Sequence, residues 1–518
     1  MEISINSVSD VQGSPPEIGN SAQASGSDSI AIGTNVTADS NNAISMGTNI
    51  KVSASNAVGI APDANTGASN IEGDGTVLIG SNALNRPASQ GDPTSNAVVI
   101  GKDAKVEIEK GVAVGHSSFA GEKRSTALGN TAEADGTAAV ALGHQSMGYG
   151  YRSTALGRGA TSYGNGTLAI GQDAYVERDG SISIGRDAEI NGQSTNNSIA
   201  IGDNVVVKDG NSIGMGDSIT IEGSNSIAII TSKTGHSNIT GDSAIAIGRD
   251  VRTINSRTVT IGDNTRGDGD DAITIGNNAS SLDSNVITIG ENSEADSTNA
   301  IAIGKTAEAF DSSTIAIGDG STVAGGNPNA ISIGVDTDAE NDHSITIGNG
   351  SFTSGFRSVA IGKDAFASKT DTIAIGNNSA TGDHSIAMGY DTISNSLNSI
   401  AIGRASYASS DVTVALGYNA TTDGPSSVAI GNQAETDTAT HSVAIGKGIT
   451  VNEDNVAKIA GESSDGPKQL VFKAVRDTQS DGALNNNEMT IEMDETNNAF
   501  RLRGKDSSGT IQEATVAW

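Results

Sequence analysis

A repeat of fourteen residues runs through most of the 518-residue chain and constrains its fold more than any other feature. The motif Ser-Ile-Ala-Ile-Gly recurs, and its final glycine serves as an anchor for numbering positions within each unit. Thirty anchors occur between residues 19 and 446, and 22 of the 29 intervals between them are 14 residues long. Units this short can bury their apolar side chains only by stacking on their neighbours. The chain is therefore expected to fold as a solenoid.

Apolar residues alternate within each unit. The residues one and three before the anchor are nearly always Ile, Val or Leu, and small apolar residues such as Ala132 and Ala134 follow three and five after it. A period of two is typical of strands with one buried face. Because fourteen residues hold only two facing strands, we predict an all-β fold: a parallel β-roll with two short strands per coil over residues 16–451, after an N-terminal segment of residues 1–15. The Ile pairs are expected to point inward.

The column two residues before the anchor is small and uncharged. It holds Ala, Ser, Thr or Gly, with Leu78 and Val99 as the large exceptions, and it carries no charge after Glu17. A strand face exposed to water would carry Lys, Glu or Asp in some copies, so we expect another backbone to lie against this column. A requirement of tight turns for small residues is the alternative. The column predicts a self-association face that includes Ala113, Ala141, Ala316 and Ala401.

One family shares this pattern. The segment Ser125-Thr-Ala-Leu-Gly129-Asn-Thr-Ala132-Glu-Ala134 resembles the repeats in the head domain of trimeric autotransporter adhesins. The resemblance implies a left-handed β-roll and a homotrimer in which three rolls pack around a threefold axis, so that the small-residue face becomes the trimer face. The signal peptide, heptad stalk and membrane anchor of that family are not recognised in the sequence.

The last residues, 452–518, have a different pattern. Four apolar segments, 469–476, 488–493, 500–503 and 510–516, are separated by turn-forming residues. We predict a small antiparallel β-module that serves as a cap or as a docking or assembly domain. A repetitive rod followed by such a module, with no signal peptide after Met1, resembles a bacteriophage fibre protein.

These features lead to a functional hypothesis with one alternative. We expect a trimeric head or tail fibre of a bacteriophage virion, made in the host cytoplasm and attached to other virion proteins at one end. It would act as an adhesin for a polysaccharide or protein of the host surface. The alternative is a passenger or head fragment of a bacterial trimeric autotransporter adhesin, located at the cell surface.

Composition excludes several other classes of function. The chain has 30 Lys and Arg against 61 Asp and Glu, a formal net charge of −31, which argues against a nucleic-acid partner. No apolar run is long enough to insert into a membrane. There is no cysteine, and the six histidines are scattered, so we expect no metal site and no cofactor. A coil of 14 residues is too flat for a deep catalytic groove, so we expect no catalytic residues and no enzyme.

Aromatic side chains make up only 3% of the chain, so their placement is informative. Several lie four or six residues after an anchor, and these offsets alternate with the inward positions, so the rings are expected to face outward. They are candidate contacts for sugar rings; the alternative is a ladder that stiffens the outer sheet. The candidates are Phe119, Tyr149, Tyr163, Tyr175, Phe352 and Phe366.

Three further patterns invite a functional reading. Extra residues at 85–93 and 231–240 predict loops, which are either binding sites or tolerated insertions. The tripeptide Arg266-Gly-Asp268 matches an integrin-type motif at a level close to chance. A row of Thr260, Thr274 and Thr288 is of the kind that binds ice, but it lies in the small-residue column, so ice binding is not expected.

Overall fold

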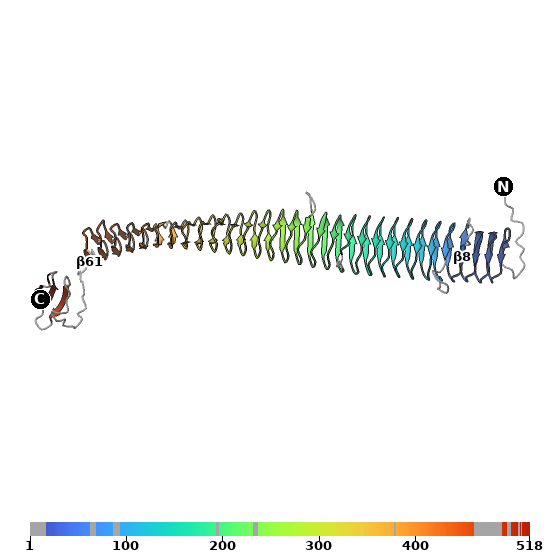
Figure 1. The fold of residues 1–518 in the computed structure, drawn as a ribbon, viewed down its shortest axis with the longest axis horizontal. Helices are drawn as coiled ribbons and strands as arrows, with labels where there is room; N and C mark the ends of the chain where they lie inside the picture. Colours follow the sequence, from blue (N-terminus) through green and yellow to red (C-terminus); the bar gives the residue numbers. More distant parts are fainter. Residues whose placement is uncertain are drawn as a thin grey trace. The chain divides into compact units, whose positions relative to one another are not determined.

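The computed structural model describes residues 17–62, 69–85, 94–192, 196–231, 237–377, 380–459, 489–494, 499–505, 508 and 510–517. The chain divides into two compact units, residues 1–384 and 385–518. The described residues are all-β and form about 30 turns of a parallel β-solenoid (Figure 1). They include no helical segment that could cross a membrane. The predicted N-terminal segment, 1–15, lies outside the described residues.

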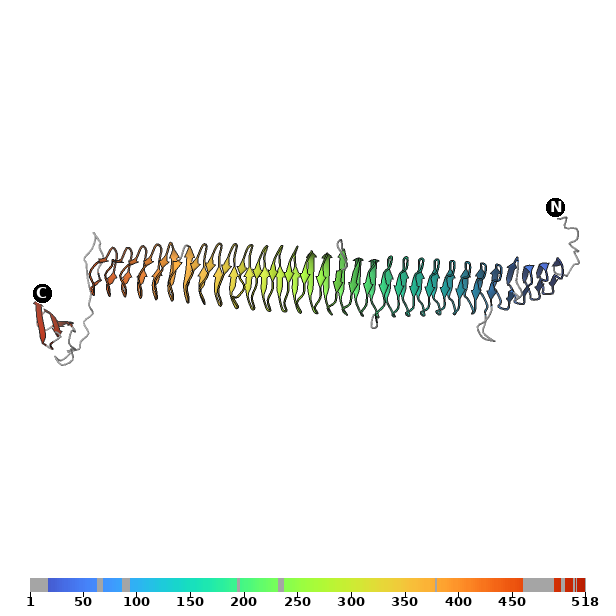
Figure 2. The ribbon, with the colours of Figure 1, turned by 45° about the horizontal axis from the view of Figure 1, so that its top comes forward.

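Each coil contains two short strands, as the repeat predicts, and the odd-numbered strand is usually the longer one. In the first unit, β13 (Val112–Val114) and β14 (Phe119–Ala120) form one coil, and β15 (Thr126–Leu128) begins the next. Val112 pairs in parallel with Thr126, and Phe119 pairs with Glu133 of β16 (Glu133–Ala134). Each residue thus pairs with the residue at the same position of the next coil. Figure 2 shows the two rows of strands side by side along the first unit.

Most odd-numbered strands contain three residues and most even-numbered strands two. The longer strands include β8 (Ser69–Ile71) and a group of odd-numbered strands with five residues, in which the anchor and the residue after it continue the strand. These are β3 (Ile30–Thr34), β5 (Ile44–Thr48), β25 (Ile199–Asp203), β27 (Ile213–Asp217), β29 (Ile227–Thr231), β31 (Ile245–Arg249), β33 (Val259–Asp263), β49 (Ile373–Asn377) and β51 (Ile386–Tyr390). The last solenoid strand is β61 (Ala457–Ile459).

The anchor glycines turn the chain where two coils approach closely. Gly115 has a φ of 137°, and a Cβ atom there would lie 2.1 Å from the carbonyl oxygen of Gly129 in the next coil. Only glycine fits such a position without displacing the backbone. This close approach explains why glycine recurs at the anchor.

The interior of each coil is filled by the small-residue columns, and this contradicts the predicted orientation of the strands. Ala113, Ala141, Ala316 and Ala401 are all 0% exposed in a single chain. Their neighbours at the Ile positions, such as Val112 and Val114 on β13, are instead partly exposed. The two sheets lie so close together that mostly small side chains fill the space between them, and the large side chains of the Ile positions point outward. The four alanines therefore belong to the core, and their assignment to a trimer face was wrong.

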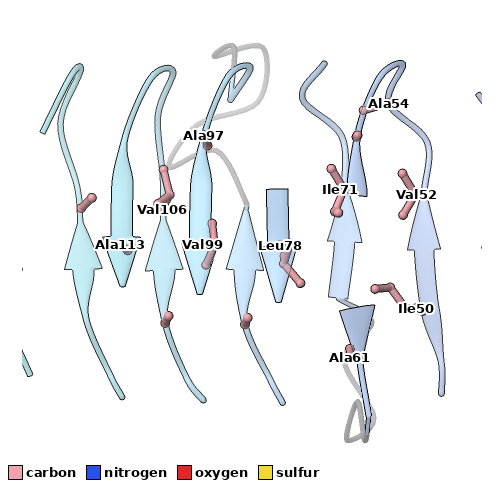
Figure 3. Packing of buried hydrophobic residues seen from close by; sticks show 14 of the residues in the cluster. Ile50, Val52, Ala54, Ala61, Ile71, Leu78, Ala97, Val99, Val106 and Ala113 are labelled. Atoms are coloured by element: carbon pink, nitrogen blue, oxygen red, sulfur yellow. The ribbon is translucent and has the colours of Figure 1, made fainter. Parts of the chain in front are cut away.

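Side-chain volumes on the two sheets compensate for each other. Gly59 occupies the small-residue column opposite three large side chains, and a Cβ atom there would lie 2.7 Å from Ile50 Cδ1 and 2.8 Å from Val52 Cγ2. Figure 3 shows Ile50, Val52 and Ile71 within this core. Leu78 and Val99, the large exceptions in the column, are also fully buried. The inward positions three and five after the anchor are confirmed by Ala132 and Ala134, both 0% exposed.

Buried hydroxyl groups close the turns between coils. The Ser125 hydroxyl, four residues before its anchor, donates to the carbonyl oxygen of Glu122 at 2.6 Å. Ser358 makes the same contact with Gly355 at 2.7 Å. Ser125 and Ser358 thus serve tight turns in the column four residues before the anchor. Tight turns do not account for the alanines of the column two before the anchor, which lie in the core.

A three-stranded antiparallel sheet follows the solenoid in the second unit. Its strands are β62 (Met489–Asp494), β63 (Ala499–Lys505) and β64 (Ile511–Ala517), with Met493 opposite Phe500 and Phe500 opposite Val516. These strands coincide with three of the four segments predicted for the C-terminal module. The fourth, 469–476, lies outside the described residues.

Candidate binding surfaces

An apolar surface covers the outside of the odd-numbered strands. We call it the aliphatic face and define it as the side chains one and three residues before each anchor. On β41 (Ile315–Ile317), Ile315 and Ile317 are half-buried while Ala316 between them is fully buried. The parallel register places Ile301 beside Ile315 and Ile303 beside Ile317. Because every coil repeats this arrangement, the side chains form two adjoining columns along each unit.

The aliphatic face is unusually apolar for a surface in contact with water. Leu128, Ile229 and Ile273 are 40%, 44% and 36% exposed in the single chain. Contiguous exposed apolar patches of this kind mark interfaces, because covering them removes apolar area from water. Sequence reasoning missed this surface because large apolar residues were assumed to lie inside. The sequence does contain a signal for this arrangement. Each unit has four columns of small residues, four and two before the anchor and three and five after it, and together they are enough to fill the narrow interior.

The six aromatic candidates lie on even-numbered strands or directly after them, and their outward orientation is confirmed. Tyr163 is 45% exposed and Phe366 41%, and the other four are half-buried. Rings of adjoining coils lie in contact: Tyr149 and Tyr163 stack with centroids 4.9 Å apart, and Phe352 and Phe366 stack at 5.4 Å. Tyr175 lies at a tilt to Tyr163, with the centroids 5.7 Å apart. Phe119 is not in these stacks and instead lies under the Lys105 ammonium, 5.3 Å from its centroid. The stacked rings have the geometry expected of a ladder that stiffens the outer sheet. They also leave Tyr163 accessible to a ligand.

Carboxylates surround the tyrosine stack. The Tyr149 hydroxyl donates to Glu133 Oε2 at 3.0 Å. Burial, followed by this hydrogen bond and the charge of Glu133, raises the pKa of Tyr149. Burial also raises the pKa of Asp135, with smaller contributions from the nearby glutamates 133, 122 and 107. This face can therefore offer both aromatic surface and hydrogen-bond acceptors to a ligand.

The structure also places the minor sequence candidates. Asp268 is only 6% exposed and forms an ion pair with Arg266, so the Arg-Gly-Asp carboxylate is not presented to a receptor. Thr260, Thr274 and Thr288 are fully buried, and Thr274 Oγ1 donates to Ser281 Oγ at 2.7 Å. This row cannot contact ice. Most of the two insertions, residues 86–93 and 232–236, lies outside the described residues.

No metal site emerges from the described part of the chain. There, His, Asp and Glu side chains do not come together in groups of three or more that could hold an ion.

Comparison with known families identifies the repeat type. The YadA head domain repeat matches nine partly overlapping segments, at 18–35, 120–146, 149–174, 162–188, 287–307, 295–321, 354–379, 380–406 and 408–434. The crystal structure of the collagen-binding domain of the Yersinia adhesin YadA is 27% identical, with a TM-score of 0.21, over 29% of this chain and 76% of that chain. No curated protein sequence matches the chain. Both the repeat type and the solenoid fold are structural rather than catalytic.

Proposed function

We propose that this chain, whose repeats are head-type repeats of trimeric autotransporter adhesins, forms the passenger region of a homotrimeric adhesin on a bacterial surface. The adhesin alternative from the sequence is thus preferred. The expectation of a virion fibre has no support in the fold or in the repeat type, and no second function is proposed.

The aliphatic face carries this proposal. It consists of side chains such as Ile301, Ile315 and Ile317, which are fixed in columns by the parallel register and are only partly covered within one chain. Packing of three such faces around a common axis removes this apolar area from water in every coil. The trimer face is therefore assigned to the Ile, Val and Leu columns rather than to the alanines.

The opposite sheet would then remain in contact with solvent. Its outward side chains include Tyr149, Tyr163, Tyr175, Phe352 and Phe366, whose stacks run across neighbouring coils. We assign the adhesive contact to this surface, where the exposed parts of the rings contact sugar rings or apolar groups of a host molecule and nearby carboxylates accept hydrogen bonds. Three symmetry-related copies would multiply weak contacts into avidity.

Oligomeric state and location test the proposal separately. Light scattering should give three times the chain mass of 51.9 kDa. Immunogold labelling of intact cells of the source organism should find the protein outside the outer surface. A monomer or dimer at micromolar concentration would contradict the trimer, whereas labelling confined to phage particles would contradict the surface adhesin and restore the virion hypothesis.

The contact surface needs its own measurement. Tyr163→Ala removes the most exposed ring of the tyrosine stack and should reduce binding to host cells at least severalfold while leaving the trimer mass unchanged. Thr421→Ala, an outward substitution on an even-numbered strand without stacked neighbours in the described structure, is the control. Equal cell binding by Tyr163→Ala and the control would limit the stack to a stiffening role.

A further inference from the structure

Arginines at the turns of the solenoid follow a simple pairing rule. Arg186 Nε donates to Asp203 Oδ1 at 2.9 Å, and Arg249 Nε donates to Asp263 Oδ1 at 2.7 Å. Both arginines directly follow an anchor, and both aspartates occupy the same position in the next coil. The coil stack therefore supplies each of these guanidinium groups with a carboxylate.

Arg404 occupies the same position in the second unit but departs from this rule. It follows β53 (Ile400–Ile402), and the equivalent positions of the two adjoining coils hold Tyr390 and Tyr418. The guanidinium carbon lies 5.9 Å from the Tyr390 ring centroid and 5.8 Å from that of Tyr418. Among the described residues, no carboxylate forms an ion pair with Arg404. The rings are 53% and 48% exposed, so the whole group is open to solvent.

This arrangement presents a preoriented cation between two aromatic surfaces. Cation–π contact with both rings limits the rotamers of the long Arg404 side chain, so that less entropy is lost when a ligand is bound. The planar guanidinium can donate two parallel hydrogen bonds to one carboxylate. The tyrosine rings beside it offer apolar faces, which pack against C–H groups, and hydroxyls, which donate and accept hydrogen bonds.

We propose that Tyr390, Arg404 and Tyr418 form a binding site for a carboxylated sugar, such as a uronic acid residue of a short acidic saccharide. The carboxylate pairs with the Arg404 guanidinium, and the sugar ring lies against a tyrosine. A simple carboxylate would contact only the arginine, and a neutral sugar would contact only the tyrosine rings. Because the site contains both groups, it selects a ligand that carries a carboxylate and a sugar ring. The site is distinct from the tyrosine and phenylalanine stacks of the first unit.

The net charge of −31 restricts the size of the acidic ligands that can approach this site. A large acidic protein or a nucleic acid would be repelled over its whole surface. A short acidic saccharide approaches only one coil or a few, and repulsion from charges farther than roughly 8 Å is screened at physiological ionic strength. Binding is thus expected to persist at physiological salt and to weaken in dilute buffer.

Biolayer interferometry on the full chain tests the site with three probes: trigalacturonate, its fully methyl-esterified form and neutral maltotriose. Trigalacturonate should bind, and the ester and maltotriose should bind at least about tenfold more weakly because they lack the carboxylate. Arg404→Gln should reduce trigalacturonate binding to the level of the ester. Arg404→Lys should retain only part of the trigalacturonate binding, because an ammonium cannot donate two parallel hydrogen bonds to one carboxylate in the same geometry. Arg186→Gln, which removes an arginine already paired with Asp203, should leave binding unchanged.

Each of the following results would overturn the proposal. Equal binding of trigalacturonate and its ester would exclude recognition of the carboxylate. Unchanged binding by Arg404→Gln, or an equal loss with Arg186→Gln, would place the ligand elsewhere. A lower oligomer mass or melting temperature for Arg404→Gln than for Arg186→Gln would assign the Tyr–Arg–Tyr stack to the structure rather than to a ligand.

Discussion

At the scale of single residues, the turns depend on side chains that tolerate left-handed backbone. Val412 has a φ of 59° and is 56% exposed, whereas Asn398 and Ser426 occupy the same position in the adjoining coils. A β-branched side chain is strongly disfavoured in this conformation, and asparagine is among the best tolerated. Val412→Asn should therefore raise the free energy of unfolding by about 1 kcal/mol, measured by thermal or urea denaturation. Val412→Ala keeps the Cβ atom and should gain less; an equal gain would contradict the backbone explanation.

A second residue-scale effect links stability to pH. Burial, followed by the charges of Glu340 and Glu308, raises the pKa of Asp338 from 3.8 to about 6. The folded chain thus binds this proton more readily than the unfolded chain. Protonation of Asp338 therefore stabilises the folded chain fully below pH 3.8, and this stabilisation is lost as the pH rises through 6. Asp338→Asn should raise the melting temperature at pH 7.5, and the gain should shrink toward pH 4. Asp319→Asn, at an exposed turn, is the control, and a gain independent of pH would contradict the assignment.

At the scale of the strand, the periodicity of the sequence predicted the strands correctly, whereas the size of the side chains led to a wrong prediction of which face is buried. Alternation correctly predicted two short strands per coil, their parallel stacking and the outward direction of the aromatic rings. It could not decide which face of β41 is buried, because Ala316 and its neighbours Ile315 and Ile317 are all apolar. The narrow spacing of the sheets decides it, and that spacing depends on all the small columns together.

The corrected orientation changes what a charged substitution on this strand should do. If Ala316 lay on a trimer face, Ala316→Arg would disrupt association, but Ala316 is fully buried within its own coil. A guanidinium there has neither space nor partners, so we expect a loss of at least about 3 kcal/mol of stability and local unfolding before any effect on assembly. Thr322→Arg on β42 (Thr322–Val323) is the control, because it points outward between Glu308 and Asp338. Native stability for Ala316→Arg, measured by circular dichroism and limited proteolysis, would show that the interior is misassigned.

At the scale of the whole molecule, the repeat gives every coil the same three environments. Mostly small residues fill the interior, aliphatic residues cover the outside of one sheet, and polar, charged and aromatic residues cover the other. The turns carry further charged and aromatic residues, such as Arg404 and Tyr418. The Tyr–Arg–Tyr stack of the second unit could be read from the sequence as a column of similar positions. Side-chain geometry is needed to see that no carboxylate of the described residues pairs with Arg404, whereas Arg186 pairs with Asp203.

The same division predicts how a single new charge should act on assembly. Ile273, on β35 (Ile273–Ile275), is 36% exposed on the aliphatic face, whereas Ser280, on β36 (Ser280–Ser281), is outward on the opposite sheet of the same coil. In a trimer built on the aliphatic face, Ile273→Asp would place three like charges close together in an apolar surrounding, where their repulsion and desolvation both oppose association. We expect the concentration at which the trimer dissociates to rise at least tenfold by light scattering, with the β-sheet spectrum preserved. Ser280→Asp adds the same charge between Arg266 and Glu294 and should leave the trimer intact. If the two variants dissociated alike, the trimer would not be built on the aliphatic face.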